Sequence, residues 1–152
     1  MLGRLAKWLR ILGFDVLYLS KAGDPELVAI AKREGRVLLT RDTGLIERTA
    51  SRPDRLFVRS EDWEDQIVQV LDEYGLWDEV RPNTRCIPCN LPLKPLSRER
   101  ARNLVTPYVR GHASSFAICP GCERVFWQGT HYGDMEKRIA KLLERRGRTI
   151  AG

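Results

Sequence analysis

Two Cys-x-x-Cys pairs, Cys86–Cys89 and Cys119–Cys122, constrain the fold of this chain more than any other feature of its sequence. They contain all 4 of its cysteines. Each spacing lets a tight turn direct two thiolates at one tetrahedral ion. Turn-forming residues lie in or beside both pairs, namely Pro88, Asn90, Pro120 and Gly121. We therefore predict one structural zinc site, because four sulfur ligands leave no open position for chemistry.

Two other interpretations of the cysteines stay open at this point, namely two disulfides or four unrelated buried thiols. The low cysteine content argues against an oxidised framework, and so does the lack of a secretory segment at the start of the sequence. The 29 residues between the two pairs exceed the commonest spacing of zinc sites. We therefore expect an inserted segment that loops out between the two cysteine turns.

The net charge of +6 is unevenly distributed along the chain. Residues 1–80 carry 12 lysines and arginines against 15 acidic residues, whereas residues 81–152 carry 14 against 5. A basic segment with a zinc site favours a polyanionic partner, most simply nucleic acid. The alternative is a basic surface that is merely solvated. No apolar run approaches membrane-spanning length, so we expect a cytoplasmic protein that binds no membrane.

Residues 1–80 alternate between helical and extended patterns. Apolar residues at helical spacing predict helices at about residues 2–12, 24–35, 43–49 and 61–74. Short apolar runs predict strands at residues 14–19, 37–40 and 56–58. This alternation indicates a parallel sheet covered on both faces, and hence a small α/β domain over residues 1–80. We expect a zinc ribbon over residues 81–152, with a basic insertion and a C-terminal helix at about 133–146.

Three acidic residues are candidates for a second metal site. Asp42 directly follows the strand at 37–40, while Asp24 and Glu26 open the helix after the preceding strand. The carboxyl ends of parallel strands meet at one edge of a sheet, where converging carboxylates repel one another unless a divalent cation lies between them. This arrangement is typical of phosphodiester hydrolysis with Mg²⁺ or Mn²⁺. Each acid also has a structural interpretation, because Asp24 and Asp42 suit helix N-caps and Glu26 suits a helix dipole.

Several runs of the sequence together indicate a family. They are Met1–Asp15, Asp24–Leu27, Leu38–Asp42, Arg85–Asn90, Cys119–Cys122 and Val125–Tyr132. In this combination the chain resembles, over nearly its whole length, the PIN-like ribonucleases named after the C-terminal domain of the Mut-seven exonuclease. The resemblance implies a three-layer PIN-like sheet domain followed by a zinc ribbon. It also implies a metal-dependent ribonuclease in which Asp24 and Asp42 occupy acidic positions of the site, with Glu26 as a further candidate.

One departure from the family pattern concerns the start of the sequence. Proteins of this family usually begin with a short apolar strand that ends in an aspartate, directly before the run that starts here at Met1. In a PIN-like sheet that strand is central, and its aspartate is a principal metal ligand. We therefore expect either that the start codon lies further upstream or that the chain is a shortened version with one ligand fewer.

The basic half supplies candidate contacts to RNA. Arg85, Arg98, Arg100, Arg102 and His131 lie around the cysteine pairs and the insertion, where arginines would bind phosphates without reading the base sequence. His131 has a structural hydrogen bond as its alternative role. We predict an endonucleolytic ribonuclease, with dimers as one expected assembly and no small-molecule substrate. The alternatives are a non-catalytic RNA- or ribosome-binding zinc-ribbon protein and an adaptor that docks an acidic protein.

Overall fold

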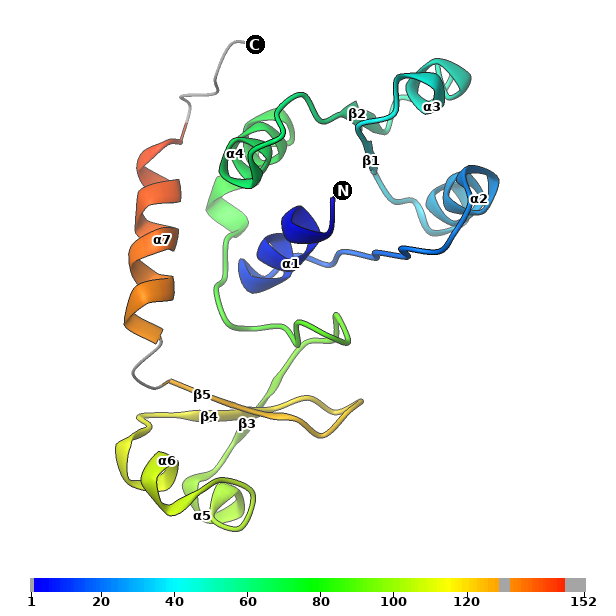
Figure 1. The fold of residues 1–152 in the computed structure, drawn as a ribbon. Coiled ribbons are helices and arrows are strands. Elements are labelled where there is room, and N and C mark those ends of the chain that lie inside the picture. Colours follow the sequence, from blue (N-terminus) through cyan, green and yellow to red (C-terminus); the bar gives the residue numbers. More distant parts are fainter. Residues whose placement is uncertain (1, 129–131, 147–152) are drawn as a thin grey trace.

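The computed structural model describes residues 2–128 and 132–146. Its N-terminal part contains a small parallel sheet and the helices around it (Figure 1). The helices are α1 (Gly3–Ile11), α2 (Asp24–Glu34), α3 (Thr43–Arg48) and α4 (Trp63–Glu73), followed by the 3₁₀ turn η1 (Trp77–Glu79). The sheet has two strands, β1 (Leu38–Thr40) and β2 (Arg55–Phe57), which pair in parallel.

Helices pack on both faces of this sheet. Leu39 and Leu56 contact the larger core, which is built mainly by α1 and α4. Leu38 points to the other side and forms a smaller core with Ala31 of α2 and Leu45 of α3. The side chains of successive strand residues alternate between faces, so consecutive leucines in β1 serve two different cores. The N-terminal part is therefore a mixed α/β unit, as the sequence predicts.

The strand expected at residues 14–19 does not form. The segment is extended but pairs with no strand among the described residues. The hydrogen-bonding groups of Val16 are occupied by side chains instead, because its N–H donates to Asn90 and its carbonyl accepts from Arg10. Leu17, Tyr18 and Leu19 are left 36–40% exposed, which is unusual for three consecutive large apolar side chains.

The cysteine-containing part is a three-stranded antiparallel sheet. Its strands are β3 (Lys94–Leu96), β4 (Phe116–Ile118) and β5 (Val125–Trp127), in the order β3-β4-β5. The residues between β3 and β4 form α5 (Arg98–Ala101) and α6 (Pro107–His112). This is the segment that the cysteine spacing predicts as an insertion. A small separate core supports it, with Leu96, Ala101, Ala113 and Phe116 at its centre.

The C-terminal helix α7 (Tyr132–Glu144) returns to the N-terminal part of the molecule (Figure 1). It packs against α4, and its Ile139 and Leu142 belong to the larger core. Ion pairs follow at its end, from Arg145 to Asp65 at 2.6 Å and from Arg146 to Asp78 at 2.7 Å. Among the described residues, no helix is both long and apolar enough to cross a membrane.

Candidate functional site

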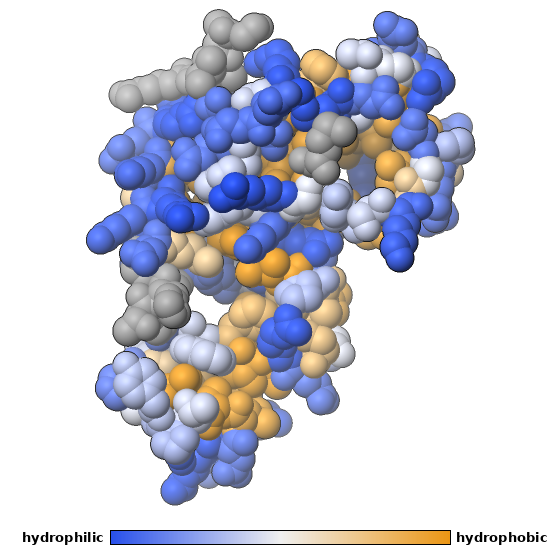
Figure 2. Space-filling model, in the orientation of Figure 1, coloured by the Kyte–Doolittle hydropathy of each residue, from blue (hydrophilic) through white to orange (hydrophobic). Residues whose placement is uncertain are grey.

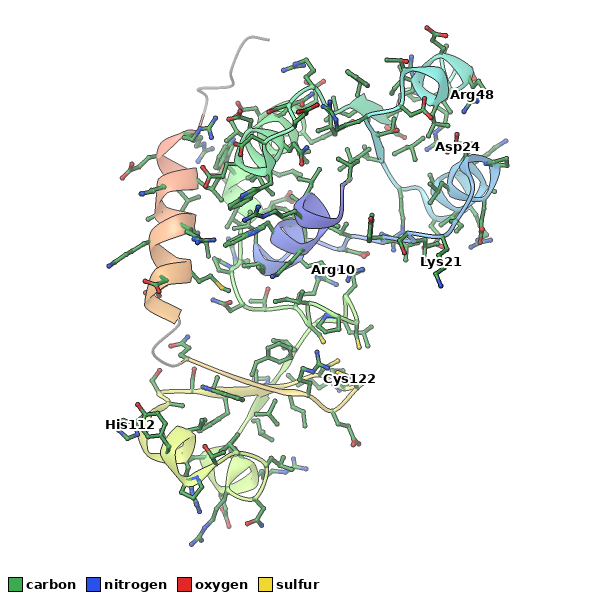
Figure 3. The ribbon with its side chains drawn as sticks, viewed as in Figure 1. Arg10, Lys21, Asp24, Arg48, His112 and Cys122 are labelled. Carbon is green, nitrogen blue, oxygen red and sulfur yellow. The ribbon has the colours of Figure 1, made fainter. Side chains whose placement is uncertain are left out.

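The four cysteines form one cluster. Their sulfur atoms all lie within 4.8 Å of one another, and the Sγ atoms of Cys86 and Cys122 are 3.8 Å apart (Figure 3). Four thiolates about 2.3 Å from a tetrahedral zinc ion lie about 3.8 Å from each other, so this spacing fits the ion. It exceeds the roughly 2.05 Å of a disulfide bond. The structure therefore favours a shared metal site over two disulfides or unrelated thiols.

Two equivalent turns position the sulfurs. In each turn the residue after the second cysteine donates its N–H to the carbonyl of the first, from Asn90 to Cys86 at 2.8 Å and from Glu123 to Cys119 at 2.9 Å. Asn90 and Glu123 both adopt a positive φ, of 63° and 62°. The tight spacing of each pair requires this left-handed residue, which asparagine tolerates better than glutamate.

The surroundings of the cysteine thiols shift their pKa values in different directions. Burial raises the pKa of the Cys86 thiol far above its ordinary value. The backbone N–H of Cys122 lowers the pKa of Cys119, and the N–H of Gly121 acts in the same direction. Backbone donors thus favour the thiolate at Cys119, whereas Cys86 keeps its proton until a cation displaces it. Cys86 and Cys119 are buried, while Cys89 and Cys122 face the solvent.

The first cysteine turn is joined to the N-terminal part by a network of hydrogen bonds, which we call the junction and define as Arg10, Asp15, Val16, Ile87 and Asn90. Arg10 donates to the Val16 carbonyl from Nε and Nη2, at 2.9 and 2.8 Å, and to the Ile87 carbonyl from Nη1 at 2.6 Å. Asn90 accepts from the Val16 N–H at 2.9 Å and donates to Asp15 at 2.6 Å. The cysteine turn and the segment after α1 therefore hold each other in place.

Asp15 makes the junction sensitive to acid. Partial burial would raise the pKa of its carboxyl, but hydrogen bonds from Arg36 and Asn90 outweigh this effect and hold the pKa below its usual range. A depressed pKa in the folded state means that the ionised carboxylate stabilises the fold above the unfolded-state pKa. This contribution is lost as the pH falls through the folded-state pKa.

Asn90→Gly tests the junction. Glycine keeps the positive φ but removes both side-chain hydrogen bonds, so the free energy of unfolding should fall by about 1–3 kcal/mol. Glu123→Gly is the matched control, because Glu123 occupies the equivalent position of the second turn and is exposed. Chemical denaturation of the metal-loaded protein measures both variants. Equal stability of the two variants would mean that the junction contributes nothing.

A second site lies beside the parallel sheet, in a cavity of about 890 Å³. Asp24 at the start of α2 and Asp42 just after β1 both line this cavity. Glu26 is exposed and is not among the lining residues. Sequence reasoning did not include Asp15, which also lines the cavity. The only signal for it was its place shortly after the end of α1, in a segment expected to be a strand.

The surroundings of the two aspartates differ from each other. Asp42 caps α3, because its Oδ1 accepts from the N–H groups of Gly44 at 2.8 Å and Leu45 at 3.2 Å. Asp24 is not a cap, since Gly23 occupies the N-cap position and makes no side-chain bond. Instead Asp24 Oδ2 pairs with Arg48 at 2.7 Å (Figure 3). The capping interpretation therefore holds for Asp42 and fails for Asp24.

The acids do not form a closed metal site by themselves. Within the described ranges, the four cysteines are the one group of three or more metal-ligating side chains close enough to share an ion. Asp24 and Asp42 each keep one carboxylate oxygen, Oδ1 and Oδ2 respectively, without a hydrogen bond to any described residue. Two carboxylates on one cavity are the donor type that Mg²⁺ and Mn²⁺ prefer.

The arginines expected to bind RNA fall into two groups. Arg85 donates to the carbonyl of Asn90 at 2.7 Å, and Arg98 donates to the carbonyls of Arg110 and Ala113, so both guanidinium groups hold the ribbon together. Arg100 and Arg102 are exposed, and their guanidinium groups make no hydrogen bond or ion pair with any described residue. His131 lies outside the described residues.

These features define a class, namely a mixed α/β unit joined to a small antiparallel ribbon that carries a four-cysteine metal site. The comparisons with known proteins add the family. Residues 1–139 match the model of the Mut7-C RNAse domain, and the chain belongs to this family. The search of curated proteins and the search of solved structures found no match.

Proposed function

We propose that the chain is a divalent-metal-dependent ribonuclease, which cleaves RNA internally by phosphodiester hydrolysis. Membership of an RNase domain family supports this reading. The observation that carries it is that Asp24 and Asp42 line one cavity, and that Asp42 follows the carboxyl end of β1. This is the edge at which open α/β sheets place their ligands. The helices on both faces of the sheet are consistent with a PIN-like three-layer architecture.

Asp24 and Asp42 would hold Mg²⁺ or Mn²⁺, which when bound supplies an activated water and charge stabilisation at the phosphate. Asp42 can offer Oδ2 while Oδ1 remains the cap of α3. The Asp24 carboxylate is now neutralised by Arg48, whose side chain is 60% exposed. Arg48 can therefore turn away without breaking any buried contact, and its guanidinium then lies near enough to bind a substrate phosphate. Glu26, exposed on α2, remains a further candidate ligand.

In this proposal the cysteine cluster holds a structural zinc ion, and the ribbon binds RNA through exposed basic residues. A second function is supported by the partners of the acids, because the cap made by Asp42 and the ion pair of Asp24 are ordinary structural roles. On that reading the chain is a non-catalytic RNA- or ribosome-binding protein.

Metal-dependent cleavage of a labelled, structured RNA separates the two functions. The purified chain should cut the RNA when Mn²⁺ is added, and it should bind the RNA without cutting it when Mn²⁺ is left out. Binding of the RNA without cleavage at any Mn²⁺ concentration would contradict the ribonuclease function and favour the non-catalytic RNA-binding protein. Absence of both binding and cleavage would contradict both functions.

The double variant Arg100→Ala, Arg102→Ala tests the role of the ribbon. Each arginine that binds a phosphate should contribute about 1 to the slope of log affinity against log salt, so the slope should become shallower by about 2. The stability should change little, because these side chains are exposed and make no hydrogen bond or ion pair with any described residue. Arg98→Ala is the control, and it should lower stability by about 1–3 kcal/mol because Arg98 bonds two carbonyls. An unchanged salt slope in the double variant would show that these two arginines do not bind the phosphates of RNA.

A further inference from the structure

The insertion between β3 and β4 carries two exposed aromatic rings that stack on each other. Tyr108 is 61% exposed and His112 is also exposed. The centroids of the two rings lie 4.0 Å apart, with an angle of 21° between the ring planes. Both residues lie on α6, four positions apart, which is the spacing that brings two side chains together on one face of a helix. Figure 3 shows His112 on α6, well away from Cys122.

One face of the Tyr108 ring is covered by His112, and the opposite face is open. A side chain that is 61% exposed while one ring face is stacked must leave most of its other face to the solvent. The small core of the insertion receives Val109 from α6 rather than Tyr108. Tyr108 therefore presents a flat aromatic surface on which another planar ring can stack.

Hydrogen bonds hold the two rings in place before any ligand binds. The Nδ1 of His112 donates to the carbonyl of Tyr108 at 2.8 Å, which fixes the imidazole ring against the helix. At the end of α6, the guanidinium of Arg98 donates to the carbonyls of Arg110 and Ala113, so α6 is tied to α5. A planar ligand thus meets ordered rings, and little side-chain entropy is lost when it binds.

The surroundings of the two rings are basic. Residues 97–113 contain 4 arginines and 1 acidic residue, Glu99. Arg100 and Arg102 are exposed, and their guanidinium groups make no hydrogen bond or ion pair with any described residue. The lower part of the molecule, which contains α5 and α6, ends in hydrophilic residues on the face seen in Figure 2. This charge favours an anionic ligand over a neutral carbohydrate or an apolar peptide.

We propose that Tyr108, backed by His112, is a stacking platform for an unpaired base of RNA, while Arg100 and Arg102 bind phosphates of the same strand. Stacking on an aromatic side chain requires a base with a free face, whereas the bases of duplex RNA are already stacked on each other. The platform therefore selects single-stranded or looped RNA. This inference rests on the proposed function, because it names the class of RNA that the chain binds.

Tyr108→Ala tests the platform in a binding experiment without Mn²⁺. The variant should bind a short, labelled oligouridine about 5- to 150-fold more weakly than the parent, the range for loss of one base stacked on an aromatic side chain. Its affinity for an abasic strand of the same length should stay within about twofold of the parent, since that strand has no base to stack. The slope of log affinity against log salt should not change, because stacking neutralises no phosphate.

Two further variants make the test specific. Tyr108→Phe keeps the ring and should restore the affinity that Tyr108→Ala loses. Leu104→Ala removes a 56% exposed apolar side chain from the same insertion, and it should leave the affinity for oligouridine within about twofold of the parent. An equal loss of affinity in Leu104→Ala and Tyr108→Ala would mean that the surface makes only apolar contacts, which overturns the proposal.

The outcomes distinguish this inference from the proposed function. If the parent binds RNA and Tyr108→Ala binds oligouridine equally well, the platform is overturned and the proposed function stands. If Tyr108→Ala shows the expected loss but the parent cuts no RNA with Mn²⁺, the platform is confirmed and the ribonuclease activity is contradicted. If the parent binds neither the oligouridine nor the abasic strand, both are contradicted.

Discussion

Asp42→Asn should lower the Mn²⁺-dependent rate of RNA cleavage by about 10²–10³-fold, the loss typical when a charged group that stabilises a transition state is removed. Asparagine keeps an oxygen that accepts from Gly44 and Leu45, so α3 stays capped and the stability changes little. The variant thus separates the two roles of Asp42, because it removes the negative charge and preserves the cap. Single-turnover cleavage of a labelled RNA measures the rate.

The matched control is Asp62→Asn. Asp62 caps α4 through a bond from Asp65, and it is exposed and absent from the cavity lining. The same change of charge at the same kind of position should leave the rate within about twofold of the parent, since it touches no reacting group. If both variants cut as fast as the parent, the activity arises from a contaminant or from another site, and Asp42 is not a ligand.

Cys119→Ser should abolish zinc binding and unfold the ribbon. For small zinc domains the free energy of metal binding, about 10–16 kcal/mol, is the free energy of folding. The ribbon fits this description, because its separate core is small, with four buried residues at its centre. Metal content should fall from one zinc ion per chain to none, and circular dichroism should show the loss of the ribbon's structure. The larger core around α1 and α4 should still unfold cooperatively.

Removal of zinc from the parent by a chelator should reproduce the variant. In both cases the amides of Asp15 and Val16 should exchange faster, because the turn that holds them through Asn90 and Ile87 is lost. A variant that keeps its zinc would show that another residue replaces Cys119, so the four-cysteine site would need a different ligand set.

Some parts of the molecule could be predicted from sequence because they depend on local chemistry. The two cysteine turns need a fixed spacing, which is visible in the sequence. The left-handed residue of the second turn, Glu123, carries no such signal. Helices with strong apolar periodicity, such as α1 and α4, lie within two residues of their expected bounds. Asp24 and Asp42 line one cavity because the segments that precede them end at the same edge of the parallel sheet.

Other features depend on long-range contacts that a sequence does not display. Residues 14–19 have the composition of a strand, but no described strand lies beside them and the side chains of Arg10 and Asn90 take up the main-chain groups of Val16. Arg98 looks like a phosphate ligand because it is basic and near the surface. Its guanidinium nevertheless binds the carbonyls of Arg110 and Ala113, 12 and 15 residues away in the chain.

The side chain of Arg10 limits how the two parts of the protein can be separated by gene rearrangement. Its guanidinium joins Val16, in the N-terminal part, to Ile87, which lies 77 residues after Arg10 and inside the first cysteine turn. A gene fusion or deletion that separated the ribbon from the α/β unit would leave a part-buried cation with unmatched donors, and the turn would lose its support. The two parts are thus poor candidates for independent shuffling between genes, and recombination should preserve them together.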